Sequence, residues 1–189
     1  MLKRQKVQEA PGYQFKDIQL LLEAMTHKSA KMETSYDRLE FLGDAVLEIA
    51  LTECYYSKFP DAPLEDFKNF KCRLLSNNAL GSLYTSLGLE YAIIVSGLQF
   101  KLPLKKEIAR ANRFKPSKQT GWRGLNLEKI LRDAFEALIG AVFVDGEFAI
   151  DPVQEILRQI LVPSTDRIGM ECPTFAARSL AATHPAATT

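Results

Sequence analysis

The sequence predicts an all-α protein, a helical bundle organised around two long helices that both carry acidic residues. The first long helix covers residues 36–59 and the second covers residues 127–142. In both, apolar residues recur at intervals of three and four and occupy most of the helix surface, which is typical of a buried helix. Both also place a pair of acids beside a glycine. We therefore expect the two helices to pack antiparallel, with their acids converging.

The first long helix combines a buried face with a stripe of carboxylates. Its predicted buried face consists of Leu39, Leu42, Val46 and Ile49. The acids that share one stripe along it are Asp37, Glu40, Asp44 and Glu48. A stripe of this kind is most often the solvated side of a helix. Gly43 argues for more, because a glycine inside a helix is destabilising by roughly 1 kcal/mol and is kept where another group must approach the backbone closely.

The second long helix repeats this pattern. Asp133 and Glu136 lie on one face, with Lys129 one turn before Asp133 and Gly140 one turn after Glu136. Carboxylates that converge in a half-buried site repel one another, so they either take up protons or hold a cation. Oxygen ligands alone suit Mg²⁺ or Mn²⁺ and not zinc. Such a site is used for in-line displacement at a phosphodiester.

Three stretches of the chain resemble the ribonuclease III family. Residues 37–48 (DRLEFLGDAVLE) are similar to the signature helix of that family, and residues 133–145 (DAFEALIGAVFVD) to its second acidic helix. Residues 24–29 (AMTHKS) are similar to the short motif that precedes the signature. Their order and spacing match over residues 16–162. The resemblance implies an all-α ribonuclease III endonuclease domain that forms a homodimer through the signature helix, with Phe41 fitting a pocket on the partner.

The resemblance also implies the chemistry. The metal-binding acids of the family match Glu40, Asp44, Asp133 and Glu136, and the intact set is expected of a working nuclease. Asp37 matches a further acid that orients a water molecule. The implied activity is hydrolysis of double-stranded RNA to 5′-phosphate and 3′-hydroxyl ends with short 3′ overhangs. The implied cofactor is Mg²⁺, with Mn²⁺ as a substitute.

Lys129 is expected to point at the metal site and to steady the scissile phosphate. A lysine at this position, preceded by a long insertion, resembles the Dicer branch of the family more than the bacterial branch.

Residues 98–132 differ from the rest of the chain in charge. They hold ten basic and two acidic residues, a net charge of +8, whereas the whole chain is +1. The segment is either a loop that contacts RNA phosphates beside the acidic site or a solvated loop without that role. The candidate RNA-binding residues lie in the insertion at 98–126: Lys101, Lys105, Lys106, Arg110, Arg113, Lys115, Lys118 and Arg123.

The remaining segments complete a single domain. Shorter helices are predicted at residues 16–30, 64–75, 79–87 and 151–161. His27 is expected to fix the end of the first of them and not to act as a base. The predicted organisation is an N-terminal extension (1–15), a catalytic domain (16–162) and a flexible, disordered tail (163–189).

Composition narrows the class of protein. The apolar share of 47% over 189 residues is ordinary for a soluble globular domain, and no apolar run is long enough to cross a membrane. Cys54, Cys72 and Cys172 are scattered, which favours free thiols in a reducing compartment. We expect an intracellular protein of the cytoplasm or nucleus, with an organelle left open.

Two other classes of function are compatible with the same fold. One is a non-catalytic duplex-RNA-binding or ribosome-associated protein, and the other is a protein that shields duplex RNA or pairs with a second nuclease. The tail offers no room for a double-stranded-RNA-binding domain. Affinity for RNA is therefore expected to come from the nuclease domain, from a helper RNA-binding protein or from further parts of a longer protein.

Overall fold

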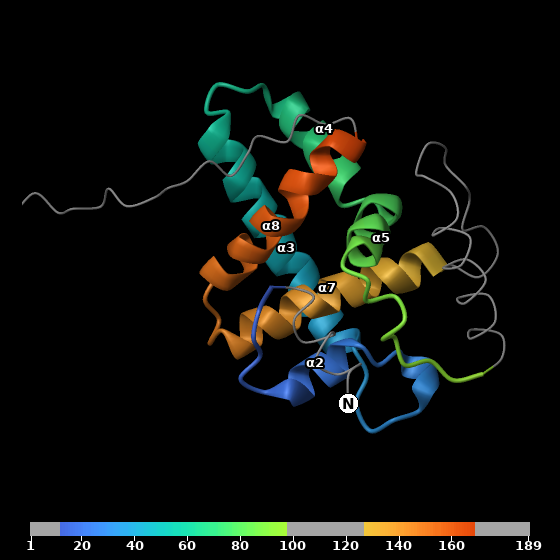
Figure 1. The fold of residues 1–189 in the computed structure, drawn as a ribbon. Helices are drawn as coiled ribbons and strands as arrows, with labels where there is room; N and C mark the ends of the chain where they lie inside the picture. The colour runs from blue at the N-terminus through green and yellow to red at the C-terminus, as the bar shows by residue number, and fades with distance from the viewer. Residues whose placement is uncertain (1–11, 98–126, 169–189) are drawn as a thin grey trace, which may run out of the picture.

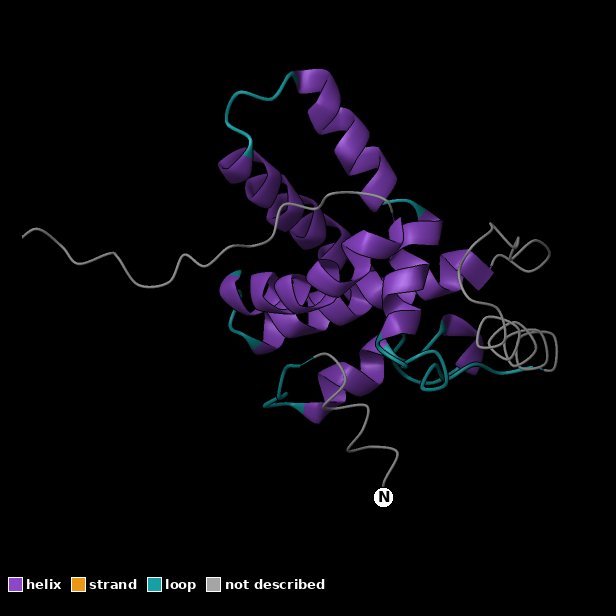
Figure 2. Ribbon diagram, turned by 45° about the horizontal axis from the view of Figure 1, so that its top comes forward, coloured by secondary structure: helices purple, strands orange, loops and turns teal. Residues whose placement is uncertain are grey.

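The computed structural model describes residues 12–97 and 127–168. Its helices are α2 (Ile18–Ala24), α3 (Asp37–Lys58), α4 (Leu64–Leu74), α5 (Asn77–Ser86), α7 (Leu127–Asp145) and α8 (Asp151–Ile168), with a short 3-10 helix, η1, at Lys28–Ala30. Within these two ranges the helices are joined by loops and there is no strand (Figure 2). The predicted all-α bundle is confirmed.

Helix α7 forms the centre of the bundle. Every residue from Asp133 to Val142 is buried, because α3, α5 and α2 pack against it from different sides (Figure 1). A helix that is apolar around its whole circumference can only be stable in such a position. The core is therefore arranged around the helix that also carries Asp133 and Glu136.

Helices α3 and α7 cross at two glycines. A Cβ atom at Gly43 would overlap the carbonyl oxygen of Glu136, and a Cβ atom at Gly140 would overlap the carbonyl oxygen of Leu39. Residue numbers thus run in opposite directions across the contact, as the predicted antiparallel packing requires. The helices cross instead of lying side by side along their lengths (Figure 1). The absence of two side chains lets the backbones touch, and this brings the acids of the two helices together.

Asp145, the last residue of α7, binds the N-terminal segment of the described chain. Asp145 accepts hydrogen bonds from the backbone N–H groups of Lys16, at 2.9 Å, and Asp17, at 2.8 Å. It also accepts one from the Tyr13 hydroxyl, at 2.8 Å. The carboxylate is buried and has three donors, so it ties the N-terminal segment to the central helix.

A short pairing of backbones fixes the turn after α2. Thr26 and Ile94 form an isolated parallel bridge, and Ile94 accepts a hydrogen bond from the N–H of His27 at 3.0 Å. The His27 ring is buried, and its Nδ1 accepts from the N–H of Ser29 at 3.1 Å, which caps η1. Burial lowers the pKa of His27. His27 therefore has a structural role, but it caps the start of η1 and does not fix the end of the first helix, which lies at Ala24.

Two predicted boundaries are wrong by more than three residues. The first helix ends at Ala24 and not at residue 30, because the chain turns there to pair with Ile94. The last helix does not end at residue 161 but continues to Ile168, so the flexible tail predicted from residue 163 begins inside α8. The part of that tail from 169 to 189, the extension from 1 to 11 and the insertion from 98 to 126 lie outside the described residues.

The other predicted segments agree with the structure. Helices α4 and α5 match the predictions to within two residues, and Ser76 caps α5 by accepting from the N–H of Ala79 at 3.3 Å. Cys54 and Cys72 form no disulfide bond in the described part of the chain, and Cys172 lies outside that part. In the described part of the chain, no helix has both the length and the apolar character needed to traverse a bilayer.

Candidate metal centre

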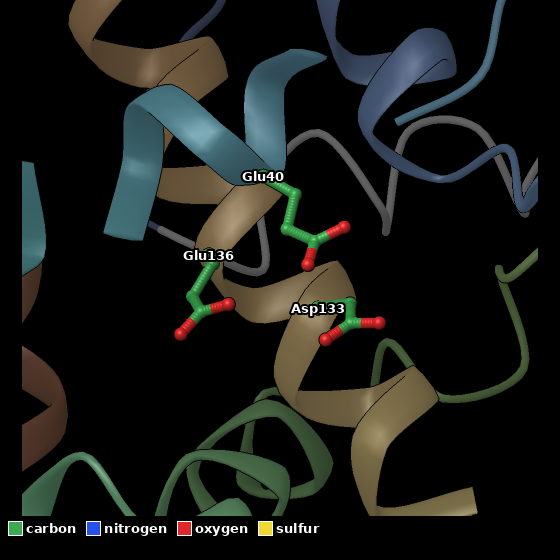
Figure 3. A group of neighbouring side chains, drawn as sticks. All are labelled: Glu40, Asp133 and Glu136. Atoms are coloured by element: carbon green, nitrogen blue, oxygen red, sulfur yellow. The ribbon is translucent and has the colours of Figure 1, made fainter. Parts of the chain in front are cut away.

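Three carboxylates converge where α3 crosses α7. Glu40 comes from α3, and Asp133 and Glu136 come from α7; one oxygen from each lies within 4.8 Å of the others. Figure 3 shows Glu40 reaching toward Asp133, and Glu136 with one oxygen directed toward the other two residues and one directed away. The predicted convergence of acids from the two helices is therefore present for three of the four proposed ligands.

Burying these acids in their charged form is unfavourable in free energy. Glu136 is 0% exposed and Asp133 is 5% exposed. Burial raises the pKa of Glu136 to about 8; Arg132 opposes the shift and Asp44 adds to it. Burial also raises the pKa of Glu40, with Asp133 as the second cause. Desolvation and mutual repulsion both disfavour the charged carboxylates, and a cation held between them would remove this penalty.

Lys129 neutralises one side of the cluster. Its Nζ lies 2.6 Å from Asp133 Oδ2 and 3.7 Å from Glu40 Oε1. Burial works to lower the pKa of Lys129, but its hydrogen bond to Asp133 and the charges of Asp133 and Glu40 outweigh this and raise it. Lys129 is therefore a charged group at the edge of the three acids, in the position predicted from the sequence.

Asp44 is placed differently from the other three predicted ligands. Its Oδ1 lies 3.3 Å from Nη2 of Arg132, and the same nitrogen lies 2.8 Å from Glu136 Oε1. Asp44 and Glu136 thus share one nitrogen of the guanidinium, and Asp44 lies outside the group formed by Glu40, Asp133 and Glu136.

The donor set of the three acids fits a divalent cation. Oδ1 of Asp133 and both carboxylate oxygens of Glu136 are buried without a hydrogen bond; the approach of Arg132 to Glu136 is an ion pair that does not have hydrogen-bond geometry. Buried polar oxygens are nearly always paired in folded proteins. Asp133 and Glu136 thus have carboxylate oxygens without hydrogen bonds close to a carboxylate oxygen of Glu40, and such oxygens are ligands that Mg²⁺ and Mn²⁺ accept.

Besides Asp44, two more acids of the predicted stripe lie outside the cluster. Asp37 is exposed at the start of α3, where it accepts a hydrogen bond from the Ser35 hydroxyl at 3.2 Å. Glu48, two turns beyond Glu40, forms an ion pair with Lys71 of α4. Of the four acids in the stripe, Glu40 belongs to the cluster and Asp44 borders it through Arg132. The other two are solvated at the start of α3 (Asp37) or join two helices (Glu48).

Sequence reasoning missed two neighbours of the site, Arg132 and Tyr36. Arg132 was counted only as part of the basic segment, although its spacing of four residues from Glu136 places both on one face of α7. Tyr36 is 1% exposed, and burial together with the nearby charges of Asp133 and Glu40 raises its pKa. No pattern in the sequence distinguishes this tyrosine from a core aromatic residue.

The opposite face of α3 is apolar and exposed. Phe41 is 85% exposed and Ile49 is 62% exposed, and Ala45 between them is also exposed. Tyr56 continues the same face two turns further on. The prediction that Ile49 lies on the buried face is wrong, because α7 covers only the side of α3 that carries Leu39, Val46 and Gly43. We call Phe41, Ala45, Ile49 and Tyr56 the exposed face of α3.

The ribonuclease III domain family matches residues 37–147 of the chain. A ribonuclease 3 of Francisella tularensis (subsp. holarctica) is 33% identical over 164 residues, which cover 87% of this chain and 60% of that protein. Endoribonuclease Dicer homolog 2a of rice is 33% identical over 156 residues, 80% of this chain and 11% of that protein. The chain spans less than two thirds of both relatives, and identity does not separate the bacterial from the Dicer branch.

Solved structures agree with the fold. Two structures of the nuclease domain of ribonuclease III from Campylobacter jejuni are 30% identical, with TM-scores of 0.61 and 0.62. The first match covers 83% of this chain and 97% of that domain. Dicer from Pichia stipitis matches with a TM-score of 0.55 at 22% identity, over 82% of this chain and 59% of that one, which supports the fold alone.

Proposed function

The chain belongs to the ribonuclease III family, and from this membership and the acid cluster we propose that it is a metal-dependent endoribonuclease acting on double-stranded RNA. The observation that carries the proposal is the convergence of Glu40, Asp133 and Glu136, in which three buried oxygens lack hydrogen bonds: Oδ1 of Asp133 and both oxygens of Glu136. A site built only for stability would pair these oxygens with donors.

The side chains have distinct roles in this proposal. Glu40, Asp133 and Glu136 would hold Mg²⁺, for which Mn²⁺ substitutes, and Asp44 supports the site through Arg132 and Glu136. A bound divalent ion activates water and stabilises the leaving oxygen of a phosphodiester. Lys129, already charged at the edge of the acids, would bind a non-bridging oxygen of the scissile phosphate. Asp37 would orient the attacking water from the solvent side.

The exposed face of α3 suits a second copy of the chain. Large apolar side chains on one helix face are seldom left in water over such a length, and the nuclease domain of Campylobacter jejuni ribonuclease III has a structurally flexible region involved in dimer formation. In the proposed homodimer, two sites related by a two-fold axis would cut the two strands of a duplex. The products would carry 5′-phosphate and 3′-hydroxyl ends with short 3′ overhangs.

Removing Phe41 tests the dimer. Phe41→Ala should shift sedimentation of the protein toward the monomer, because it deletes the most exposed large apolar group of that face. Tyr91→Ala is the matched control, since Tyr91 is another exposed aromatic residue on a different part of the surface. Equal sedimentation of Phe41→Ala and the unmodified protein would place the interface elsewhere.

Duplex RNA would be recognised by shape and charge. A-form RNA is read mainly through phosphates and 2′-hydroxyl groups, and the basic residues of the 98–126 insertion supply the charge for such contacts. Those residues lie outside the described structure, so their part in binding rests on the sequence. A helper RNA-binding protein remains part of the proposal.

The test of the activity is cleavage of a long labelled RNA duplex by the purified chain, with Mg²⁺ or with EDTA, beside single-stranded RNA of the same sequence. We expect cutting of the duplex alone, only with the metal, and products that carry 5′-phosphates. Retained duplex binding without cutting, at any Mg²⁺ concentration, would favour the non-catalytic RNA-binding alternative.

A further inference from the structure

The acidic cluster contains an arginine that the proposed chemistry does not use. Arg132 projects from α7 between Asp44 and Glu136, and a single nitrogen, Nη2, contacts an oxygen of each. Glu136 lies four residues along the same helix, so the helix itself fixes the pair. A cation shared by two carboxylates from two helices occupies the position in which a bridging metal ion would lie.

We propose that Arg132 takes the place of a second divalent ion, so that each chain binds one divalent ion at Glu40, Asp133 and Glu136. This inference rests on the proposed metal-dependent function and specifies its stoichiometry. Active sites for phosphodiester cleavage often hold two ions about 3.5–4 Å apart. Here the second cation would be a guanidinium, which is always charged.

The charges of the site support a single ion. The four carboxylates Glu40, Asp44, Asp133 and Glu136 face two cationic side chains, Lys129 and Arg132. One divalent ion makes this group electrically neutral. A second ion would leave it with two excess positive charges in a half-buried place, where like charges repel strongly.

The two sides of the cluster also differ in their unpaired oxygens. On the side of Glu40 and Asp133, Oδ1 of Asp133 has no donor, and Lys129 reaches only the other oxygen of that carboxylate. On the side of Asp44, Oδ1 accepts a hydrogen bond from Arg132. Both oxygens of Glu136 also lack hydrogen bonds, but Oε1 of Glu136 is already in an ion pair with Arg132, so the resident cation lies on the side of Asp44 and Glu136.

Arg132 is held firmly enough for this role. Its side chain is 26% exposed, and its Nε is fully buried. The stem is enclosed, and the guanidinium is fixed by acids from both helices. A second ion between Asp44 and Glu136 would have to expel the guanidinium from both ion pairs.

The experiment counts bound Mn²⁺ by electron paramagnetic resonance, with no RNA and no turnover. The metal-free protein is titrated with Mn²⁺, and free and bound ions are separated by their signals. We expect one tightly bound Mn²⁺ per chain in the unmodified protein and in Arg132→Lys, which keeps the charge. Arg132→Gln should bind two, with the magnetic coupling expected of two neighbouring ions.

Arg158→Gln is the matched control. Arg158 on α8 also pairs with an acid of its own helix, Glu155, so the same substitution there removes an arginine away from the cluster and should leave the count at one. Circular dichroism checks that every variant is folded.

Each result has one meaning. Two coupled ions in the unmodified protein would overturn the role of Arg132 and leave the proposed nuclease intact; this holds even if Arg132→Gln does not fold. A count that stays at one in a folded Arg132→Gln would also overturn it. No bound Mn²⁺ in the unmodified protein would instead count against the proposed metal centre itself.

Discussion

Helix α7 buries the carboxylates of Asp133, Glu136 and Asp145, and the last two differ in their hydrogen-bond partners. Asp145, at the end of the helix, accepts three hydrogen bonds from Tyr13, Lys16 and Asp17. Glu136, in the middle, is more deeply buried, and neither of its oxygens accepts a hydrogen bond. The two acids lie on one element of one core, so the difference lies in their partners.

The pKa values follow this difference. Burial raises the pKa of Glu136 to about 8, against the opposing charge of Arg132. Burial also works to raise the pKa of Asp145, but the donors from the backbone of Asp17 and Lys16 and from Tyr13 outweigh it and lower the pKa. A buried acid with a full set of donors stabilises the fold, whereas a buried acid without donors is ready for a ligand. The proposed division of roles can be tested one acid at a time.

The largest expected effect is the loss of cleavage in Glu136→Gln. The amide keeps the shape of the side chain but removes the charge that would hold the metal, so the rate should fall roughly 1,000-fold, the scale of losing one fixed charged group in an active site. Duplex binding should remain. Cleavage of a labelled duplex and a filter-binding assay measure the two quantities. Near-normal cleavage by this variant would contradict the role of Glu136 as a ligand.

Asp145→Asn should lower the stability of the protein and leave its cleavage rate unchanged. The amide keeps one accepting oxygen but replaces the other with an NH2 group, so the N–H group of either Lys16 or Asp17 loses its acceptor, which costs about 1–3 kcal/mol of unfolding free energy. Urea denaturation measures this loss. At a temperature where the variant is folded, its cleavage rate should match that of the unmodified protein. If Glu136→Gln were the less stable and Asp145→Asn the less active, the comparison would fail.

In EDTA, without metal, Asp145 and Glu136 should change the stability of the protein with pH in opposite directions. Asp145 has a lowered pKa, so it contributes stability above the unfolded value of about 3.9 that is lost as the pH falls through the folded pKa. Glu136 has a raised pKa, so stability is greatest below the unfolded value of about 4.3 and declines as the pH rises toward about 8.

Variants show which acid causes each part of the curve of stability against pH. Glu136→Gln should gain stability relative to the unmodified protein between pH 5 and pH 8. Asp145→Asn should be least different from it at the acid end. Urea midpoints from pH 3 to pH 8 give both curves, and parallel curves for the two variants would contradict the assignment.

The surroundings of Glu136 could be predicted from the sequence far better than those of Asp145. The convergence of Glu40, Asp133 and Glu136 follows from helical spacing and from two glycines that permit a close crossing, and all of these are visible as local patterns. The partners of Asp145 are backbone N–H groups from the other end of the chain, and no spacing encodes such a contact. Arg132 was missed for a related reason: its spacing to Glu136 is local, but its contact with Asp44 depends on the crossing of two helices.

The boundary errors have the same origin. The first helix ends at Ala24 because residues near Thr26 pair with Ile94, a tertiary contact that overrides local helical periodicity. Ile49 lies on the apolar side of α3 by spacing, but that helix has apolar residues on two faces, and only one of them meets α7.

The smallest expected effect on stability is that of removing the Lys16 side chain while keeping its backbone N–H group. Lys16 supplies a main-chain N–H to Asp145, whereas its ammonium group forms an exposed ion pair with Glu147. Lys16→Ala keeps the N–H and removes only the ion pair, so the urea midpoint should not change measurably, as is common for exposed pairs. Tyr13→Phe is the matched variant, because it removes one of the three donors to Asp145 and should cost about 0.5–1.5 kcal/mol. A larger loss in Lys16→Ala than in Tyr13→Phe would mean that surface charge, and not the three donors, holds the N-terminal segment to α7.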